Sequence, residues 1–580
     1  MQNETKNCQN CKKDFTIESE DFKFYEKIKV PPPTFCPDCR LIRRLTWRNE
    51  RSLYRRICNL CEKKIIAMYH SSSPFPVYCR ECWYGDGWDP ASFAREYDMQ
   101  KPFFEQYKEF SNTVPRLALW QRNVINSDYS NMTGESKNVY LSVSVVKNSE
   151  NIFYSKSVDG SRDILDCMNI INSENLYENT EAQGNYNSQY LLLCRNCMDS
   201  YYSFDCINCS DCFLSYNLRN KKFCIRNKQY SKEEYLKEIE KFDLKSRTSR
   251  EKKLAEEFEK IKKEAIFRFG NTTKAVNSTG NNLLNVKNCK NCFGVYNTED
   301  SKNCFRIFDS RDCMDVDYAG WSELVYEYTT GAKDAFNVKF SYSAMEAVRN
   351  AEYTESCRNC NNIFGCISLR NKENAILNKV YSKKEFTALR KKIIGQMEYM
   401  PYVDAGGRVY KYGEFFPIEV SPWAYNETPA QELAPITKEE AGESGYPWRK
   451  LEKKNFKITI PADKIPDSIE NVDKKILKEV LGCAHGEFCN HQCSSAFRIT
   501  DYELKFHKKH NIPIPNLCPN CRYYTRFAII PELKLYTRSC VCEKVNHNHK
   551  EKCLNEFETA YAPERLEKVY CESCYNKEVY

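Results

Sequence analysis

The sequence predicts a mainly β protein in which small α+β zinc fingers, paired at both ends, flank a two-part β-solenoid-like middle with a helical insertion. Three observations lead to this fold class: the grouping of the cysteines, a short strand-like unit that recurs in the middle, and N-terminal phrases that return near the C-terminus. The 32 cysteines fall into three blocks, with eight in residues 1–82, fourteen in 167–366 and ten in 483–574.

A chain of 580 residues is too long for one core and should divide into several domains. The first predicted unit is a double zinc-finger module at 1–100, followed by a connector at 101–124. The remaining predicted units are a first solenoid half at 125–230, a helical insertion at 231–270, a second solenoid half at 271–382, a helix and ordered connector at 383–475, and a C-terminal double zinc-finger module at 476–580.

Composition and charge exclude some classes of protein. The net charge of +8 arises from 87 basic and 79 acidic residues, which does not by itself indicate a nucleic-acid binder. No apolar run of about 18 residues is present to cross a membrane, and the N-terminus lacks the pattern of an export signal. We therefore expect a cytoplasmic protein with no membrane partner, where cysteines bind metal rather than form disulfides.

The first cysteine block consists of four CxxC pairs. Two residues between cysteines let a tight turn direct both thiolates at one tetrahedral zinc ion, and two pairs complete a closed site. The order of a ligand pair, an intervening segment and a second pair that opens a helix is typical of a treble-clef finger. Sequence order assigns one ion to Cys8, Cys11, Cys36 and Cys39 and a second to Cys58, Cys61, Cys79 and Cys82, although crossed pairing is also compatible with the spacing.

The last cysteine block repeats this plan. CKKDFTI returns as CSSAFRI and PVYCRECWY returns as KVYCESCYN, which indicates an internal duplication of roughly residues 5–85 in residues 486–576. A third zinc ion is assigned to Cys489, Cys493, Cys518 and Cys521, and a fourth to Cys542, Cys553, Cys571 and Cys574. We thus expect four zinc ions, and at least three.

Two of these ligand sets leave alternatives open. In the third site the first pair is CxxxC, and the nearby substitutes for its members are Cys483, His485 and His491. In the fourth site Cys540, Cys542 and Cys553 compete for two places, with His547 and His549 in reach.

The middle of the chain contains a recurring short unit, seen in KNVYLS, SENIFYS and SRDILDC and again in KNCFGVY and RDCMDVD. Most units follow one another after 9 to 13 residues, which suits the sides of a coiled β-solenoid with Asn or Asp at its corners. The middle also has CxxC spacings. We interpret its cysteines as an inward-facing ladder of packed thiols, because they stand where Ile152, Ile164 and Leu176 stand in other units; zinc binding there is the alternative.

One group of residues, an arginine-rich segment, indicates a binding function as well as a structural role. Residues 40–56 have helical periodicity and are rich in arginine, with Trp47 and Tyr54 interleaved, which suits phosphate contact and base stacking. The candidate nucleic-acid-binding residues are Arg40, Arg43, Arg44, Arg48, Arg51 and Arg55. Alternatively, these arginines pair with acidic groups of the middle region or are simply solvated.

These features favour a zinc-binding, non-catalytic binding protein that contacts nucleic acid through the arginine-rich helix. The alternative is a protein–protein interaction scaffold or assembly factor built on the solenoid. An enzyme is less expected, because four-cysteine sites are closed, whereas catalytic zinc keeps an open position. A carbohydrate-active solenoid enzyme, with carboxylates Asp309, Asp312, Asp315 and Asp317, is a remote alternative. The sequence does not indicate the oligomeric state.

Several longer phrases carry a resemblance to a known group. They include WRNERSLYRR, VYCRECWYGDGWDPASF, NLRNKKFCIRNKQYSKEEY and FFPIEVSPWAYNET. By these phrases the chain resembles the multi-zinc-finger proteins, treble-clef or zinc-ribbon-like, of candidate-phylum bacteria. The resemblance covers much of the chain and implies zinc binding, but it implies no activity.

Overall fold

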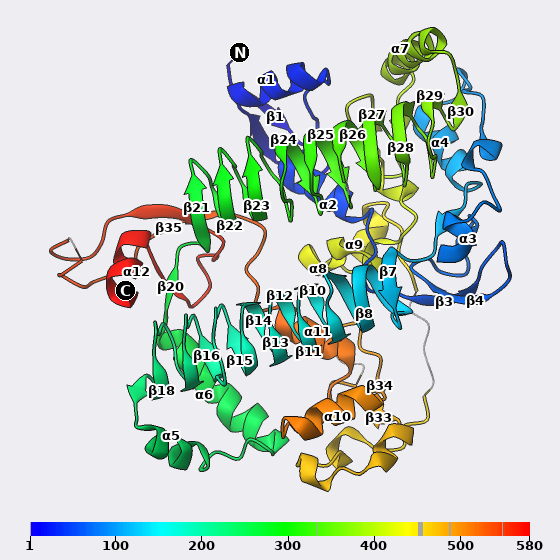
Figure 1. The fold of residues 1–580 in the computed structure, drawn as a ribbon. Coiled ribbons are helices and arrows are strands. Elements are labelled where there is room, and N and C mark those ends of the chain that lie inside the picture. Colours follow the sequence, from blue (N-terminus) through cyan, green and yellow to red (C-terminus); the bar gives the residue numbers. More distant parts are fainter. Residues whose placement is uncertain (1, 332, 451–455, 487–488, 548) are drawn as a thin grey trace.

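The computed structural model describes residues 2–331, 333–450, 456–486, 489–547 and 549–580. Two stacks of parallel strands form its centre, and the cysteine-rich segments from both ends of the chain pack around them (Figure 1). None of the helices in the described ranges is long and apolar enough to span a membrane.

The first stack is formed by residues 121–229. Its strands are β7 (Gln121–Ile125), β8 (Tyr129–Val146), β9 (Glu150–Phe153), β10 (Lys156–Asp159), β11 (Arg162–Leu165), β12 (Met168–Ile171), β13 (Glu174–Tyr177), β14 (Thr180–Gln183), β15 (Tyr186–Leu192), β16 (Tyr201–Phe204), β17 (Ser210–Phe213), β18 (Lys222–Ile225) and β19 (Lys228–Gln229). The long strands β8 and β15 join two parallel ladders, β9–β11–β13 and β10–β12–β14, so that eight strands close into a ring.

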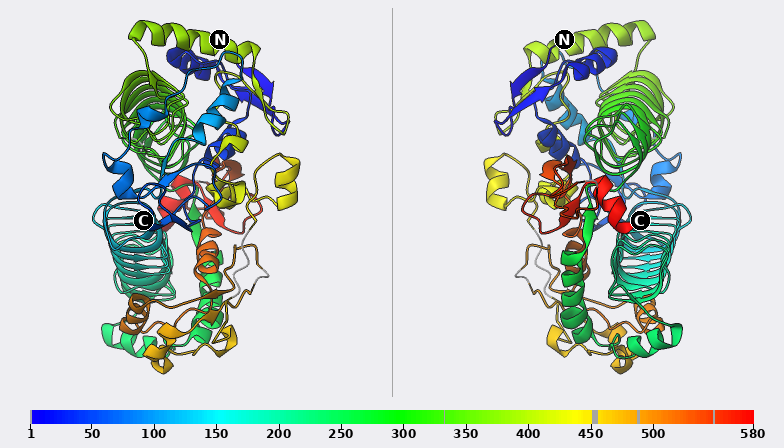
Figure 2. Two further views of the ribbon diagram at one scale, coloured as in Figure 1. Left: turned by 90° about the vertical axis from the view of Figure 1, so that its right-hand side faces the viewer. Right: turned by 90° about the vertical axis from the view of Figure 1, so that its left-hand side faces the viewer.

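The second stack is formed by residues 272–380 and remains open. Its ten strands pair in sequence order: β21 (Thr272–Val276), β22 (Gly280–Lys287), β23 (Cys292–Glu299), β24 (Arg311–Asp317), β25 (Ser322–Thr329), β26 (Ala335–Tyr342), β27 (Glu346–Glu352), β28 (Arg358–Phe364), β29 (Glu373–Ile376) and β30 (Lys379–Val380). The prediction of two like solenoid halves is therefore corrected, because one stack closes on itself and the other does not. Figure 2 shows both stacks nearly end-on, as superposed turns of the chain.

The short repeat unit explains why these residues stack. Paired residues lie 11 to 13 positions apart, as in Thr272 with Leu283, Arg162 with Glu174 and Ser322 with Ala335. Asn and Asp occupy many of the corners with positive φ, a region that these residues tolerate better than most. Their side chains also bond from turn to turn: the amide of Asn138 donates to Asn151 at 2.9 Å, and that of Asn151 donates to Asp163 at 2.8 Å.

Helical segments connect the stacks and cover their ends. The insertion between the stacks contains α5 (Lys232–Ile239), a π-helical turn (Ser249–Leu254), α6 (Ala255–Glu264) and β20 (Ile266–Arg268). After the second stack come α7 (Lys383–Tyr399), β31 (Tyr402–Val403), β32 (Val409–Tyr410), α8 (Pro429–Leu433) and α9 (Lys438–Glu443). Ser231 and Ser382 cap α5 and α7, each accepting a hydrogen bond from the third residue of its helix.

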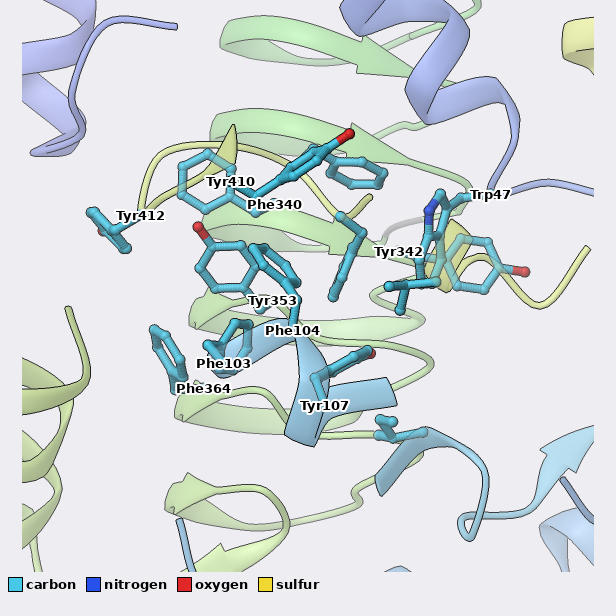
Figure 3. Close-up of a cluster of buried hydrophobic side chains, with 14 of the residues drawn as sticks. Trp47, Phe103, Phe104, Tyr107, Phe340, Tyr342, Tyr353, Phe364, Tyr410 and Tyr412 are labelled. Atoms are coloured by element: carbon cyan, nitrogen blue, oxygen red, sulfur yellow. The ribbon is translucent and has the colours of Figure 1, made fainter. Parts of the chain in front are cut away.

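An aromatic core joins the second stack to segments far away in the sequence (Figure 3). Phe340 and Tyr342 of β26 meet Phe103 and Phe104 of α4 (Phe103–Ser111), together with Trp47 and Tyr410 from further segments. The segment described above as an ordered connector contributes Phe415, Phe416 and Trp423, all buried; its residues 451–455 lie outside the described ranges. The N-terminal module therefore packs on the second stack over a large apolar surface.

The cysteine-rich ends form four small fingers of similar plan. The first has β1 (Glu4–Asn7), β2 (Asp14–Ile17), α1 (Ser19–Ile28) and α2 (Pro37–Leu45), and the second has β3 (Tyr54–Ile57), β4 (Lys64–Ala67), β5 (Val77–Tyr78) and α3 (Arg80–Tyr84). The third has β33 (Leu481–Gly482), β34 (Ala496–Phe497), α10 (Asp501–Lys509) and α11 (Pro519–Phe527). The fourth has β35 (Tyr536–Ser539), β36 (Glu556–Thr559), β37 (Lys568–Tyr570) and α12 (Glu572–Val579).

Candidate metal centres

Each finger brings four thiols together where the turn of a β-hairpin meets the start of a helix. In the first finger these are Cys8, Cys11, Cys36 and Cys39, and in the second Cys58, Cys61, Cys79 and Cys82. These are the sets that sequence order assigned, without crossed pairing. The ligand atoms within each group all lie within 4.8 Å of one another, so each group could hold a metal ion.

The sulfur positions fit a tetrahedral ion. A zinc–sulfur bond of about 2.3 Å places the sulfurs of a tetrahedron about 3.8 Å apart, whereas a disulfide bond is about 2 Å long. The Sγ atoms of Cys11 and Cys36 are 3.7 Å apart, those of Cys61 and Cys79 are 3.8 Å apart, and those of Cys553 and Cys571 are 3.9 Å apart. The donor sets therefore have the size and chemistry of four-cysteine zinc sites.

One hydrogen bond recurs in all four fingers and identifies equivalent ligands. The backbone N–H of the cysteine that caps the helix donates to the first cysteine of the hairpin turn, at 3.2 or 3.3 Å. The donor and acceptor residues are Cys36 and Cys8, Cys79 and Cys58, Cys518 and Cys483, and Cys571 and Cys540. In every finger, the same backbone hydrogen bond therefore holds the first of the four cysteines in place.

Backbone N–H groups favour the thiolate, the form that binds metal, at two of the ligands, whereas burial raises the pKa of others, for example that of Cys82 to about 11. Burial acts to raise the pKa of Cys58, but the N–H groups of Cys61, Cys79 and Leu60 outweigh it and lower that pKa to about 7. For Cys571 burial is likewise outweighed, chiefly by the N–H of Cys574, and the pKa is lowered to about 7.

The C-terminal ligand sets differ from those assigned from spacing. The third finger groups Cys483, Cys493, Cys518 and Cys521, so Cys483 replaces Cys489. The fourth groups Cys540, Cys553, Cys571 and Cys574, so Cys540 replaces Cys542. The physical reason is that two residues separate the hairpin ligands in the N-terminal fingers, whereas nine residues separate Cys483 from Cys493 and twelve separate Cys540 from Cys553. The spacing between cysteines therefore predicted the wrong ligand. The pairing of β33 with β34 identifies the right one, because β33 ends directly before Cys483.

The arginine-rich segment of the first finger is buried rather than displayed. Helix α2 ends at Leu45, not near residue 56, and packs on β24 and β25 of the second stack. Arg40 pairs with Asp315 at 2.8 Å, Arg43 with Glu327 at 2.8 Å, and Arg44 with Asp317 at 2.6 Å. All six of these side chains are at most 3% exposed, and Glu414 adds a second carboxylate to Arg43 at 2.9 Å. We call this network the first lock.

The remaining arginines of the segment are also mostly engaged. Arg48 pairs with Glu50 at 2.7 Å and is buried. Arg51 lies over the ring of Tyr523 in the third finger, with its guanidinium carbon 3.4 Å from the ring centroid. Of the six arginines proposed to contact nucleic acid, only Arg55, on β3, is exposed to solvent. For Arg40, Arg43 and Arg44 the contacts bear out the alternative interpretation, which is pairing with acidic groups of the middle region.

The third finger repeats the same contact on the first stack. Arg522 of α11 pairs with Asp166 at 2.7 Å, and Arg526 pairs with Glu178 at 2.9 Å and with Asp166 at 3.1 Å. We call this network the second lock. The two locks are related by the internal duplication, since SRDILD at 161–166 corresponds to SRDCMD at 310–315, and CPNCR at 518–522 to CPDCR at 36–40.

The acidic residues suggested for a carbohydrate-active site have structural contacts in the fold. Asp315 and Asp317 are fully buried beneath the arginines of α2. Asp312 pairs with Lys27 at 2.9 Å, and Asp309 accepts a hydrogen bond from Asn297 at a corner of the stack. These four carboxylates do not converge on a shared cleft, so the suggestion of a catalytic cluster is corrected.

The cysteines of the stacks are buried in the interior of the turns. Their Sγ atoms contact backbone carbonyls two residues earlier, as in Cys167 with Leu165 and Cys304 with Lys302, both at 3.3 Å. A thiol needs its proton to donate such a bond, and burial raises the pKa of Cys366 to about 12. These contacts are the ones expected of packed thiols.

The second lock gives the fold a pH dependence. Burial raises the pKa of the Glu178 carboxyl to about 7, against the effect of Arg526, whereas an unfolded Glu titrates near about 4.3. A raised folded pKa contributes stability that is complete below the unfolded pKa and is lost as the pH rises through the folded pKa. The free energy of unfolding should therefore fall by about 1 kcal/mol between pH 6 and pH 8 from this group alone.

Glu178→Gln should remove that part of the pH dependence while keeping a hydrogen-bond acceptor for Arg526. Urea unfolding of zinc-loaded protein at pH 6 and pH 8 measures it, and the comparison of the variant with the parent isolates the contribution of Glu178. An equal pH dependence in both proteins would contradict the assignment to Glu178.

Fold and site together define a mainly β protein with cysteine clusters at both ends that could hold metal ions. A scan against protein-family models finds no match for the chain, and a search of the curated proteins finds none either.

Proposed function

We propose that this chain is a zinc-dependent, non-catalytic interaction scaffold that binds a protein partner on the second stack and works in the reducing cytoplasm. Zinc in the fingers fixes α2 and α11, and these helices hold the two stacks through the first and second locks. The observation that carries the proposal is the burial of the finger arginines against carboxylates of the same chain. Buried, paired arginines of this kind stabilise the packing of the fingers on the stacks. They are not accessible to the phosphates of a nucleic acid.

The second stack offers a groove in which a partner could bind. It is an open groove of about 790 Å³ along β21 to β27, and Trp321, at 48% exposure, and Phe336 provide its aromatic surface. Its basic residues are Lys274, Lys287, Arg311 and Arg349, and its acidic residues are Glu299, Asp309, Glu323 and Asp334. A nucleic-acid groove carries an excess of positive charge, whereas this balanced lining with an exposed tryptophan suits a protein surface.

A photo-crosslinking amino acid placed at position 321 tests this proposal. The full zinc-loaded chain is expressed in the cells that normally make it, and adducts are identified by mass spectrometry before and after nuclease treatment. The matched control carries the same amino acid at Tyr399, which is 70% exposed on α7. The proposal expects a nuclease-resistant polypeptide adduct at position 321 and none at position 399. A nuclease-sensitive adduct, or equal adducts at both positions, would contradict it.

A further inference from the structure

The expanded turns of the two C-terminal fingers carry additional ligand-type residues. Residues 484–492 contain His485, Cys489 and His491, and residues 541–552 contain Cys542, His547 and His549. Each turn thus adds one cysteine and two histidines to a finger that already has four cysteines. The N-terminal turns, Cys8 to Cys11 and Cys58 to Cys61, have no room for such residues.

In the third finger the added residues form a second group around a shared cysteine. His485, Cys489, His491 and Cys521 have their ligand atoms within 4.8 Å of one another, and Cys521 also belongs to the four-cysteine group. The Sγ of Cys521 lies 3.6 Å from that of Cys489 and 3.8 Å from that of Cys483. Both distances are close to the edge of a zinc–sulfur tetrahedron, so one sulfur can bridge two ions.

Each histidine of this group has one ring nitrogen, Nδ1, without a hydrogen-bond partner among the described residues. These Nδ1 atoms, of His485 and His491, are buried. The ring of His491 stacks on Tyr524 of α11, with centroids 5.5 Å apart, which fixes its orientation beside Cys521. A buried ring nitrogen without a partner is costly, and coordination of a metal ion would satisfy it.

In the fourth finger the histidines of the expanded turn also lie beside cysteine sulfurs, in two separate pairs. His549 Nε2 lies 3.5 Å from the Sγ of Cys574, and His547 Nδ1 lies 3.2 Å from the Sγ of Cys542. The second nitrogen of each ring is occupied: His549 Nδ1 contacts the carbonyl of Glu551 at 2.7 Å, and His547 Nε2 lies 3.4 Å from the Glu578 carboxylate. Metal-binding histidines are oriented in this way by carbonyl or carboxylate partners.

We propose that each C-terminal finger binds a second zinc ion, held by the cysteine and two histidines of the expanded turn and bridged to the first ion by Cys521 or Cys574. The inference rests on the zinc binding proposed above. Four thiolates around one divalent ion carry a net charge of −2, and a second ion that brings one more thiolate reduces this to −1. The second ion therefore reduces the net negative charge of a partly buried site, and with it the free-energy cost of burying that charge. The chain then holds six zinc ions, one in each N-terminal finger and two in each C-terminal finger.

Elemental analysis of the full, reduced chain after removal of loosely bound metal tests this stoichiometry. Six zinc ions per chain are expected. The triple variant H485A/C489S/H491A and the triple variant C542S/H547A/H549A should each lose one ion and remain folded, because the four-cysteine groups are untouched. His510→Ala is the matched control; its half-buried ring lies on Phe506, outside both groups, and six ions should remain.

Cadmium NMR provides a second readout. After replacement of zinc by cadmium, ions that share a sulfur should show scalar coupling to each other, and the two N-terminal ions should not. A count of four ions, or triple variants with unchanged metal content, would overturn the second sites while leaving the proposed function intact. A metal-free, folded chain would instead contradict the proposed function itself.

Discussion

Asp315→Ala is expected to lower the free energy of unfolding by about 3–5 kcal/mol, because it removes the closest carboxylate from buried Arg40 and one of the carboxylates around buried Arg44. Arg40 contacts Asp315 at 2.8 Å, and Arg44 approaches it at 3.5 Å. Both guanidinium groups are at most 3% exposed, so water cannot replace the lost partner. Urea unfolding of zinc-loaded protein, followed by circular dichroism, measures the change.

The duplication supplies a matched variant and the surface supplies a control. Asp166→Ala removes the equivalent carboxylate from the second lock and should cost a similar amount, because Arg522 and Arg526 are also buried. Asp312→Ala lies next to the first lock in sequence but breaks a pair with Lys27, whose side chain is 49% exposed. Its cost should stay below about 1 kcal/mol. Equal losses in all three variants would show that the locks have no special role.

Removal of the metal is expected to have the larger effect, because it should open both locks at once. Zinc binding contributes on the order of 10 kcal/mol to the folding of a small structural site. Without an ion, the four thiols of the first finger lose the centre that joins them, and α2 loses the anchor that Cys36 and Cys39 give it. Buried Arg40, Arg43 and Arg44 should then become accessible to trypsin.

Limited proteolysis with and without a strong chelator, under reducing conditions, measures this exposure. Cleavage after Arg40, Arg43 and Arg44 should appear with chelator and disappear when zinc is restored, while magnesium should not restore protection. Cleavage next to Arg55, which is exposed already, serves as the internal control and should change less. Protection of α2 that is unaffected by chelator would contradict a role for metal in holding the lock.

The sequence predicted the local chemistry better than the contacts between segments. CxxC pairs carry their ligand geometry in a turn of two residues, so the N-terminal clusters could be assigned from spacing. Cys483 and Cys540 could not, because expanded turns separate them from Cys493 and Cys553, and the equivalence appears only when β33 pairs with β34 and β35 with β36. The 12-residue spacing indicated stacked turns but not that β8 and β15 would close one stack.

The arginine-rich segment is a second case in which the sequence did not predict contacts between distant segments. Its charge pattern is compatible with a phosphate-binding face or with a buried network, and the sequence contains no local signal that separates them. The decisive partners, Asp315 and Glu327, lie far along the chain. A comparison of the two copies does carry a clue: CPDCR and CPNCR are repeated together with SRDCMD and SRDILD, as expected if arginine and aspartate form one conserved contact within the duplication.

Hydrogen exchange of the amides of α2 and α11, before and after metal removal, tests most directly whether zinc holds the two stacks through the locks. Both helices should lose their protection together when the ions leave, whereas interior strands such as β26 should retain theirs, because those strands pair on both sides within the stack. Equal protection of α2 and α11 in the metal-free, reduced protein would contradict this role of zinc.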